Sequence, residues 1–332
     1  MIENYRPRLN LYETQSAIGF IKQTFQFELS RRLHLMRATA PLFVDPATGL
    51  NDDLSGIERP VSFDIPGVPG VESAQVVHSL AKWKRQALGE YGFQPDTGLW
   101  TDMNAIRRDE EPDALHSIYV DQWDWEKVIT ADMRTEAELK RTVTDIVDAI
   151  CSTLSAVKCM YPQIRVHLSR EVSFVTGQEL EDLYPTLSGK ERENAYVREH
   201  PTTFIIGIGG KLKSGKPHDG RAPDYDDWSL NGDLMFWDET LEQAVELSSM
   251  GIRVDADAMR KQCAEKGCEE RLELPFHQGV LSGKLPLCMG GGIGQSRLCM
   301  LLLGKAHIGE VQVSLWPQEM REECAKKNIV LL

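Results

Sequence analysis

The sequence predicts an α+β fold in which an antiparallel sheet is flanked by helices. Two segments, 12–35 and 135–158, carry apolar residues at helical spacing and are long enough to cover a sheet. The strands expected between residues 60 and 128 follow one another closely, which favours antiparallel pairing over the alternating strands and helices of a doubly wound fold. With 332 residues, an apolar fraction of 42% and no internal repeat, the chain is expected to form a single domain spanning 1–332.

The first elements are a long helix and a strand-like segment that contains a proline. The apolar face of helix 12–35 consists of Ile18, Ile21, Phe25, Leu29 and Leu33. Segment 35–44 has strand-like character, but Pro41 lacks the N–H that a central strand needs, so the segment fits a sheet edge or an interface. Residues 60–77 predict a hairpin around the turn PGVPG, and a helix is expected to begin at Ser79.

The remainder of the chain predicts further strands and helices. Segments 98–109 and 115–129 predict two strands joined by an acidic loop, and the helix 135–158 follows them. The other expected elements are strands at 201–210, 232–237 and 241–254, helices near 256–266 and 270–282, and a helix from about residue 294 that follows a run of glycines.

Composition restricts the classes of function. The net charge of −13 argues against a protein that binds nucleic acid, because phosphate contacts require a basic surface. No apolar segment approaches the roughly 20 residues that span a membrane, and the N-terminus lacks the apolar core of a secretory signal. None of the seven cysteines forms a Cys-x-x-Cys pair, and Cys263 and Cys268 have no second pair nearby to complete a zinc site. These features predict a cytoplasmic protein with free thiols.

The run GGGIGQSRLCMLLL, residues 290–303, indicates a nucleotide site, because glycines before a helix let a phosphate approach the backbone. A dinucleotide-binding fingerprint is excluded, since Arg297 occupies the position of its third glycine. A phosphate-binding Walker loop requires a hydroxyl residue after its lysine. Segment 210–216 approaches that pattern, but Pro217 follows the lysine, and we interpret the segment as a solvated loop rich in lysine and glycine.

The pattern Gly-x-Gly-x-Gly-x-x-Arg, filled by Gly290, Gly292, Gly294 and Arg297, resembles motif 3 of the class II aminoacyl-tRNA synthetase fold. Two further motifs of that fold appear in the expected order. LHLMRATAPLFV resembles motif 1, a helix that leads into a strand with a dimer-interface proline. MNAIRRDE followed by HSIYVDQWDWE resembles motif 2, two strands whose arginine, here Arg107, binds the α-phosphate of ATP. VELSSMGIRV is similar to a segment of the aspartyl and asparaginyl branch.

Further stretches along nearly the whole chain resemble the ammonia-dependent asparagine synthetases, a family of stand-alone catalytic domains related to aspartyl-tRNA synthetase. These stretches are DDLSG, VVHSLAKWKRQ, HSIYVDQWDWE, RAPDYDDWS, LNGD, ELSSMGIRVDAD and GGGIGQSRL. The resemblance implies a homodimeric aspartate–ammonia ligase that uses ATP and Mg²⁺. Its reaction would convert L-aspartate and ammonia into L-asparagine through a β-aspartyl-adenylate, with release of AMP and pyrophosphate. One departure is that DDWS joins LNGD directly, where bacterial members carry a longer loop.

Three arginines are candidates for binding ATP. Arg107 suits the α-phosphate, because a guanidinium donates paired, planar hydrogen bonds, although a surface arginine beside two acids is the alternative. Arg297 is expected to stack on adenine or to meet the γ-phosphate, since an arginine at a helix N-terminus is unfavourable without an anion. Arg253, on a neighbouring expected strand, is a candidate for a phosphate contact. Gly292 and Gly294 are expected to let ATP approach the backbone, and a tight strand-to-helix turn is the alternative.

Two acids are candidates for binding the metal ion. Asp233 and Glu246 lie on adjacent expected strands, and Mg²⁺ prefers one or two carboxylates together with phosphate oxygens and water. Two solvated acids at strand ends are the alternative. Ser248 and Ser249 follow on the same strand and are expected to allow the bound acyl group to approach closely.

The resemblance also assigns residues to aspartate. Lys84 and Gln122 would hold the carboxylate that is not activated, while Asp124 and Asp226 would hold the ammonium group. From the sequence alone, Lys84 also fits a charged helical face.

Two residues before the second helix have two interpretations each. Asp52 either receives the ammonium ion and takes up its proton, or is a turn aspartate that accepts its own backbone hydrogen bonds. Ser79 is either a helix N-cap or a substrate contact.

Two other functions fit parts of the pattern. A tRNA-acting relative of the aspartyl- and asparaginyl-tRNA synthetases would need an anticodon-binding domain, for which a first helix starting near residue 12 leaves no room. A regulatory paralogue would be expected to lose ATP-site residues, whereas Arg107, Arg297, Asp233 and Glu246 are all present. We therefore predict an enzyme, with neither nucleic acid nor a membrane as a partner.

Overall fold

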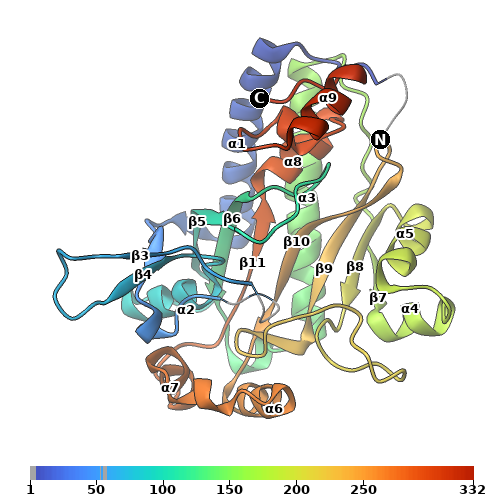
Figure 1. The fold of residues 1–332 in the computed structure, drawn as a ribbon. Helices are drawn as coiled ribbons and strands as arrows, with labels where there is room; N and C mark the ends of the chain where they lie inside the picture. Colours follow the sequence, from blue (N-terminus) through green and yellow to red (C-terminus); the bar gives the residue numbers. More distant parts are fainter. Residues whose placement is uncertain (1–4, 53, 55–57) are drawn as a thin grey trace.

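The computed structural model describes residues 5–52, 54 and 58–332. At its centre lies an eight-stranded sheet with the order β1-β5-β6-β11-β10-β9-β8-β7 (Figure 1). Its strands are β1 (Leu35–Arg37), β5 (Gly98–Ile106), β6 (Tyr119–Val128), β7 (Ser173–Thr176), β8 (Thr202–Ile206), β9 (Asp226–Asp238), β10 (Gln243–Arg253) and β11 (Cys288–Gly294). From β5 to β8 every neighbouring pair is antiparallel, which confirms the predicted kind of sheet.

The two edges of this sheet differ from its centre. β1 pairs with β5, and β7 pairs with β8, in parallel. Parallel pairing needs a long connection, and a helix lies between the members of each pair: α2 (Ala81–Glu90) before β5, and α4 (Gly177–Leu183) and α5 (Gly189–Glu199) before β8. The sequence predicted α2 but missed β7, α4 and α5.

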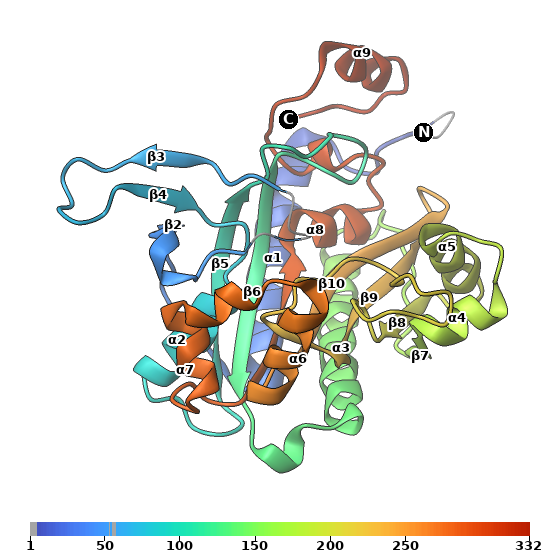
Figure 2. The ribbon, with the colours of Figure 1, turned by 60° about the horizontal axis from the view of Figure 1, so that its bottom comes forward.

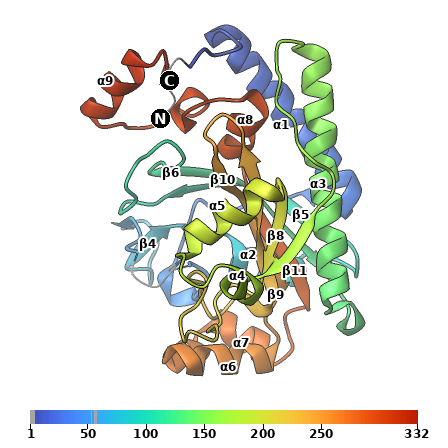
Figure 3. The same ribbon diagram turned by 90° about the vertical axis from the view of Figure 1, so that its right-hand side faces the viewer.

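Helices α1 (Leu11–Leu33) and α3 (Glu136–Met160) pack side by side on one face of the sheet (Figure 3). Both were predicted. α1 begins with a capping box between Asn10 and Glu13 and ends at His34, which adopts the left-handed conformation. Its predicted apolar face is confirmed, since Ile21, Phe25, Leu29 and Leu33 are buried and Ile18 packs against the same core.

Strand β6 separates this core from the opposite face. The ring of Trp123 lies 4.7 Å from the ring of Phe25 on α1, so Trp123 points toward the helices. Successive side chains of a strand point to opposite faces. Gln122, Asp124 and Glu126 therefore point to the other side of the sheet.

A second, three-stranded sheet has the order β2-β4-β3 and projects from the large one (Figure 2). It consists of β2 (Phe43–Val44), β3 (Ser62–Asp64) and β4 (Ser73–Val76), and the β3–β4 pair confirms the predicted hairpin. Segment 35–44 is divided between the two sheets. β1 is an edge strand, as expected, but Pro41 lies between β1 and β2 and not within a strand.

Three predicted boundaries need correction. α6 (Ala256–Lys266) was predicted, but the helix expected at 270–282 is divided into the 3-10 helix η3 (Glu269–Glu273) and α7 (Pro275–Leu281). Proline is well placed in the first turn of a helix, so it starts α7 and cannot continue η3. β9 begins at residue 226, not 232. α2 is capped by Leu80, so Ser79 is not its N-cap.

The C-terminal part follows the glycine run. α8 (Gln295–Leu303) begins directly after β11, close to the predicted start, and is buried along most of its length. α9 (Gln318–Lys326), which was not predicted, is the last helix before the C-terminus. No described helix is long and apolar enough to cross a membrane.

Candidate active site

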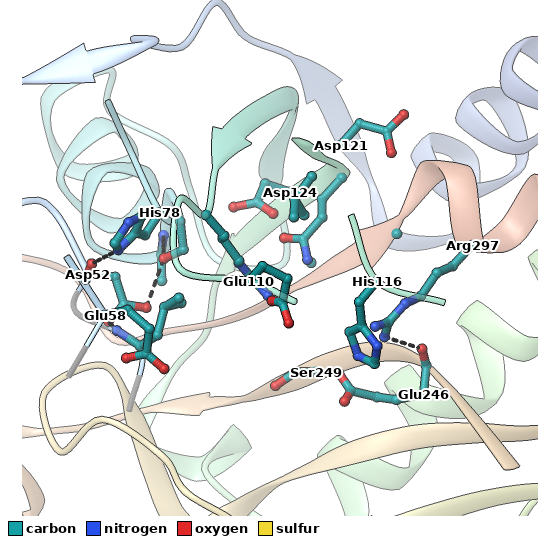
Figure 4. Close-up of a pocket in the computed structure, with 18 of the residues that line it drawn as sticks. Asp52, Glu58, His78, Glu110, His116, Asp121, Asp124, Glu246, Ser249 and Arg297 are labelled. Carbon is teal, nitrogen blue, oxygen red and sulfur yellow. Dashed lines mark hydrogen bonds between the residues drawn. The ribbon is translucent and has the colours of Figure 1, made fainter. Parts of the chain in front are cut away.

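A cavity of about 440 Å³ opens on the sheet face opposite α1 and α3. β6, β10 and β11 form its floor, and α2 and the loops around residues 107–110 and 219–226 form its walls. Figure 4 shows Asp52 and His78 at one end, Arg297 and Glu246 at the other, and Asp124 between them. The cavity therefore places acids and arginines from distant segments around one space.

The glycines of β11 are required by the side chains of β6. A Cβ atom at Gly292 would lie 2.8 Å from Oδ1 of Asp124 and would also collide with Gln122. A Cβ atom at Gly290 would overlap the carboxylate of Glu126. Since real Cβ atoms do not approach this closely, glycine lets three polar side chains lie flat across the neighbouring strand.

A buried set of ion pairs lies beneath the cavity. Lys84 donates to the carbonyl oxygen of Gly291 at 3.0 Å and lies 3.1 Å from Oδ2 of Asp124 and 3.7 Å from Oε2 of Glu126. Arg253 donates to both carboxylate oxygens of Glu126 at 2.7 Å and also pairs with Asp226. Burial would raise the pKa of Glu126, but Arg253 and then Lys84 hold this pKa below its usual value.

These pairs leave two acceptors without a donor on residues that line the cavity. Oδ1 of Asp124 and Oδ2 of Asp226 are buried and accept no hydrogen bond from any described residue. Burial raises the pKa of Asp226, and Arg253 opposes this effect only partly. A buried carboxylate oxygen without a donor is costly, so this part of the cavity suits a cationic group.

The opposite end contains arginines. Nη1 of Arg297 donates to the carbonyl oxygen of Glu246 at 2.8 Å. Arg107 lines the same end, and its Nε has no described acceptor. Burial would raise the pKa of Glu246, but Arg297 and then Arg221 hold this pKa below its usual value. This end suits an anionic group.

Asp233 and Glu246 fit the donor set of a divalent cation in part. Burial raises the pKa of Asp233 to about 6; Arg221 opposes this rise, and Glu246 adds to it. A cation between the two acids would relieve that repulsion. Arg221 donates to Asp233 at 2.6 Å and occupies one oxygen. No group of three or more metal-binding side chains occurs within the described residues, and Mg²⁺ needs only one or two carboxylates when phosphates complete its shell.

Asp52 is held in place by its neighbours. Its Oδ1 accepts from the N–H of Leu54 at 3.1 Å, and its Oδ2 accepts from the hydroxyl of Ser79 at 3.1 Å. Nδ1 of His78 lies 3.0 Å from its carbonyl oxygen. Asp52 thus makes the hydrogen bonds of a turn aspartate and also lines the cavity, so both interpretations agree with the geometry. Of the DDLSG stretch, residues 53, 55 and 56 lie outside the described residues.

Most of the residues singled out from the sequence line this one cavity. They are Asp52, Ser79, Lys84, Arg107, Gln122, Asp124, Asp226, Glu246, Ser249, Arg253, Gly292, Gly294 and Arg297. Ser248 and Asp233 do not line it: Ser248 is buried, and Asp233 lies behind Arg221.

Two further observations change the expectations from the sequence. Both edges of the Arg253 guanidinium are engaged by carboxylates, so the geometry does not favour the phosphate contact expected of it. The stretch where DDWS meets LNGD is continuous β9, so no loop borders the cavity there. Sequence reasoning missed Arg221 and Glu126. Arg221 lies in the stretch RAPDYDDWS, but no pattern in the sequence assigned it a role. The importance of Glu126 follows only from its pairing with Arg253 in the folded structure.

Comparison with known proteins gives one consistent result. The family model described as aspartate-ammonia ligase matches residues 12–328. The aspartate–ammonia ligase of Limosilactobacillus fermentum is 57% identical over 331 residues, which cover 99% of this chain and 98% of that protein. The enzyme of the same name from Clostridium perfringens is 56% identical over 330 residues, with the same coverage.

Solved structures share the fold at much lower identity. Asparaginyl-tRNA synthetase from Pyrococcus horikoshii, complexed with asparaginyl-adenylate, superposes with a TM-score of 0.67 at 15% identity, covering 92% of this chain and 70% of that chain. Aspartyl-tRNA synthetase from Entamoeba histolytica gives a TM-score of 0.57 at 16% identity, covering 91% and 57%. The predicted class II synthetase-like fold is thereby confirmed, and the chain belongs to the aspartate–ammonia ligase family.

Proposed function

We propose that this protein is an AMP-forming ligase that converts L-aspartate and ammonia into L-asparagine, and that the cavity described above is its active site. The family match over the whole chain carries the activity. The cavity supports the site, because acceptors for a cationic group lie at its centre and arginines for a polyphosphate lie at one end. A carboxylate does not react with ammonia until one of its oxygens becomes a leaving group, and ATP provides this activation.

In the first step, an oxygen of the β-carboxylate attacks the α-phosphorus of ATP, and pyrophosphate leaves. Negative charge develops on the α-phosphate, and Arg107 stabilises it with the planar donors of its guanidinium. Arg297, at the same end of the cavity, also binds the nucleotide, and its bond to the carbonyl oxygen of Glu246 fixes its direction. The products of this step are a β-aspartyl-adenylate and pyrophosphate.

Glu246, which lines the cavity, and Asp233, which lies outside the lining and pairs with Arg221, would together hold Mg²⁺, and the ion would supply positive charge to neutralise the polyphosphate. Two features of the protein fix these acids: Arg221 pairs with Asp233, and β9 and β10, which carry the acids, are adjacent antiparallel strands. This network keeps the two acids close in spite of their repulsion.

Aspartate is oriented by the other half of the cavity. Asp124 and Asp226 direct their unpaired oxygens at its ammonium group. Gln122 and Lys84 bind the α-carboxylate, and Arg221, which lines the cavity and whose buried Nε has no described acceptor, provides a further donor. We assign to Arg253 the task of holding Asp226 in place. The β-carboxylate is then left to face ATP.

In the second step, ammonia attacks the carbonyl carbon of the adenylate, the bond from that carbon to the phosphate oxygen breaks and AMP leaves, and the nitrogen releases one proton to water as the amide forms. Ammonium must first lose a proton, because its nitrogen has no lone pair while it is protonated. Asp52 lies at the end of the cavity away from Arg297, where it attracts the cation and accepts that proton. Ser79 orients its carboxylate.

We further propose that the chain acts as a single catalytic domain and as a homodimer, and that it works in the cytoplasm without nucleic acid. A tRNA-charging role is the alternative, and the net charge of −13 does not favour it. The direct test is to detect asparagine after incubation with aspartate, ATP, Mg²⁺ and ammonium, without tRNA. Absence of asparagine in that mixture would reject the proposed activity.

A further inference from the structure

A second buried ion cluster lies behind the cavity wall. Oδ2 of Asp224 lies 2.7 Å from Nζ of Lys82 and 2.9 Å from Nε2 of His277. The side chains of Asp224 and His277 are fully buried, and that of Lys82 is 4% exposed. None of these three residues, here termed the Asp224 cluster, is among the described residues that line the cavity. The proposed reaction uses none of them.

The Asp224 cluster joins three segments that are far apart in the sequence. Lys82 belongs to α2 and His277 to α7, while Asp224 lies two residues before β9 in the connection from β8. Nη1 of Arg271 on η3, a partly exposed side chain outside the cluster, lies 3.7 Å from the same Oδ2 of Asp224. Because a carboxylate only accepts hydrogen bonds, Nε2 of His277 must carry a proton to bond with it. Burial would raise the pKa of Asp224, but Lys82 and then His277 hold this pKa far below its usual value. Asp224 is therefore an anion that receives donors from both helices.

Each end of the Asp224 cluster adjoins an acid of the active site. Lys82 also donates to the carbonyl oxygen of Asn51 at 3.2 Å, and Asn51 directly precedes Asp52. Asp224 lies two residues before Asp226, the first residue of β9. The path from Asp52 to Asp226 thus runs through Asn51, Lys82 and Asp224 by two short contacts.

The Asn51 segment is fixed at its other side as well. The side chain of Asn51 accepts from the N–H of His78 at 2.9 Å and donates to Gln75 at 3.1 Å. The segment at Asn51 is therefore already bound to β4, and the contact with Lys82 sets the distance between this segment and the segment that carries Asp224. Burying such a cluster is costly and gives little net stability compared with apolar packing. A role in geometry explains its presence better than a role in stability.

We propose that the Asp224 cluster is a positioning device. It fixes the position of Asp52 relative to Asp226, so that the ammonium held by Asp52 is correctly placed to react with the aspartate held by Asp226. This inference rests on the proposed function, because it assigns Asp52 to ammonium and Asp226 to aspartate. Its residues touch neither substrate and act through Asn51 and the start of β9.

The Asp224→Asn variant keeps the shape of the side chain and removes its charge. The contacts that hold Asp52 and Asp226 at a fixed separation are then weakened. KM for aspartate and KM for ammonium are therefore each expected to rise about tenfold, while KM for ATP changes by less than about twofold. Lys82→Gln leaves the bond between Asp224 and His277 intact. It is expected to raise KM for ammonium alone and to preserve aspartate-dependent exchange of pyrophosphate into ATP, which needs no ammonia.

Lys305→Gln is the matched control. Lys305 is a buried lysine that lies 3.7 Å from Glu310 and 3.1 Å from Thr14, and it does not line the cavity. Its loss is expected to lower thermal stability and leave all three KM values unchanged. Thermal unfolding of each variant separates lost protein from altered binding, and Lys82→Gln provides the test if Asp224→Asn does not fold.

Two results would overturn the inference. One is that folded Asp224→Asn or Lys82→Gln has wild-type KM values. The other is that KM for ATP rises as much as the other two, which indicates a general loss of structure. The wild-type protein in the same assay distinguishes failure of this inference from failure of the proposed function. If the wild type makes no asparagine, the proposed function is wrong. If the wild type is active and the variants have unaltered KM values, only the positioning device is rejected.

Discussion

Asp124 and Asp226 reach one cavity from strands that are not neighbours, β6 and β9, and each presents a buried carboxylate oxygen to which no described residue donates. Arg253 and Lys84 occupy the other oxygens from below. Each acid is thus paired with a cation at one oxygen, while its other oxygen has no described donor. An ammonium group between the two oxygens would satisfy both.

Asp124→Asn and Asp226→Asn are therefore each expected to raise KM for aspartate at least about tenfold, because an amide replaces a charged acceptor beside the substrate ammonium. Steady-state kinetics with aspartate as the varied substrate measure the effect. Asp132→Asn, at an exposed position, should match the wild type. An unchanged KM in both cavity variants would remove these acids from substrate binding.

Arg107→Ala and Arg297→Ala are expected to lower kcat/KM for ATP at least about tenfold while the fold survives, because each removes a positive charge from the end of the cavity that we propose binds the nucleotide. Arg198→Ala, an exposed arginine of α5, serves as the control for loss of charge alone. Near-normal activity with unchanged ATP affinity in either variant would show that the missing arginine takes no part in the mechanism.

The proposed homodimer is expected to use the edge at β1. Met36 in β1 is 61% exposed, Leu42 just before β2 is 53% exposed, and an edge strand leaves backbone groups available to a second copy. Met36→Asp should shift the sedimentation coefficient toward that of a monomer, because a charge at the contact must be desolvated. Leu183→Asp, equally exposed on α4, should not. A wild-type protein that is monomeric and fully active at assay concentration would contradict the dimer.

Stability should fall in mild acid because of His307. Burial lowers the pKa of His307 to about 4, below its ordinary value of 6.5. Between these pH values His307 is protonated in the unfolded chain but not in the folded chain. The free energy of unfolding therefore falls by up to roughly 3 kcal/mol as the pH falls from 6.5 to 4. His307→Asn retains an acceptor for the N–H of Gly309 and cannot titrate. Its free energy of unfolding, from urea titrations, should fall less over this range than that of the wild type. Equal pH dependence would contradict this prediction.

Local pattern made part of this structure predictable. α1 has apolar residues at helical spacing and a capping box at its start, and both signals lie within the segment itself. The sequence also showed the glycine run and placed it correctly before α8. The structure adds a second reason for these glycines, because side chains from β6 lie where their Cβ atoms would be. Signals of this kind need no knowledge of distant contacts.

Other features depend on contacts between distant segments. α5 was missed because its sequence GKERENAYVRE is polar on nearly every position and has no apolar stripe of sufficient length. Ser248 and Ser249 were both placed at the substrate, but a register shift in β10 between Glu246 and Ser248 decides which residues face the cavity. The pairing of Asp224 with His277 joins residues 53 positions apart and leaves no trace in the sequence pattern.

The central claim is that ATP activates the β-carboxylate of aspartate, although related tRNA synthetases share the scaffold. The most direct test is to label both oxygens of the β-carboxylate with heavy oxygen and to follow the label by mass spectrometry of the products. The account predicts one labelled oxygen in the phosphate of AMP and the other in the amide of asparagine. Label in inorganic phosphate, with formation of ADP, would indicate an acyl-phosphate route. Label retained wholly in the amino acid, with release of AMP only when tRNA is present, would contradict the account.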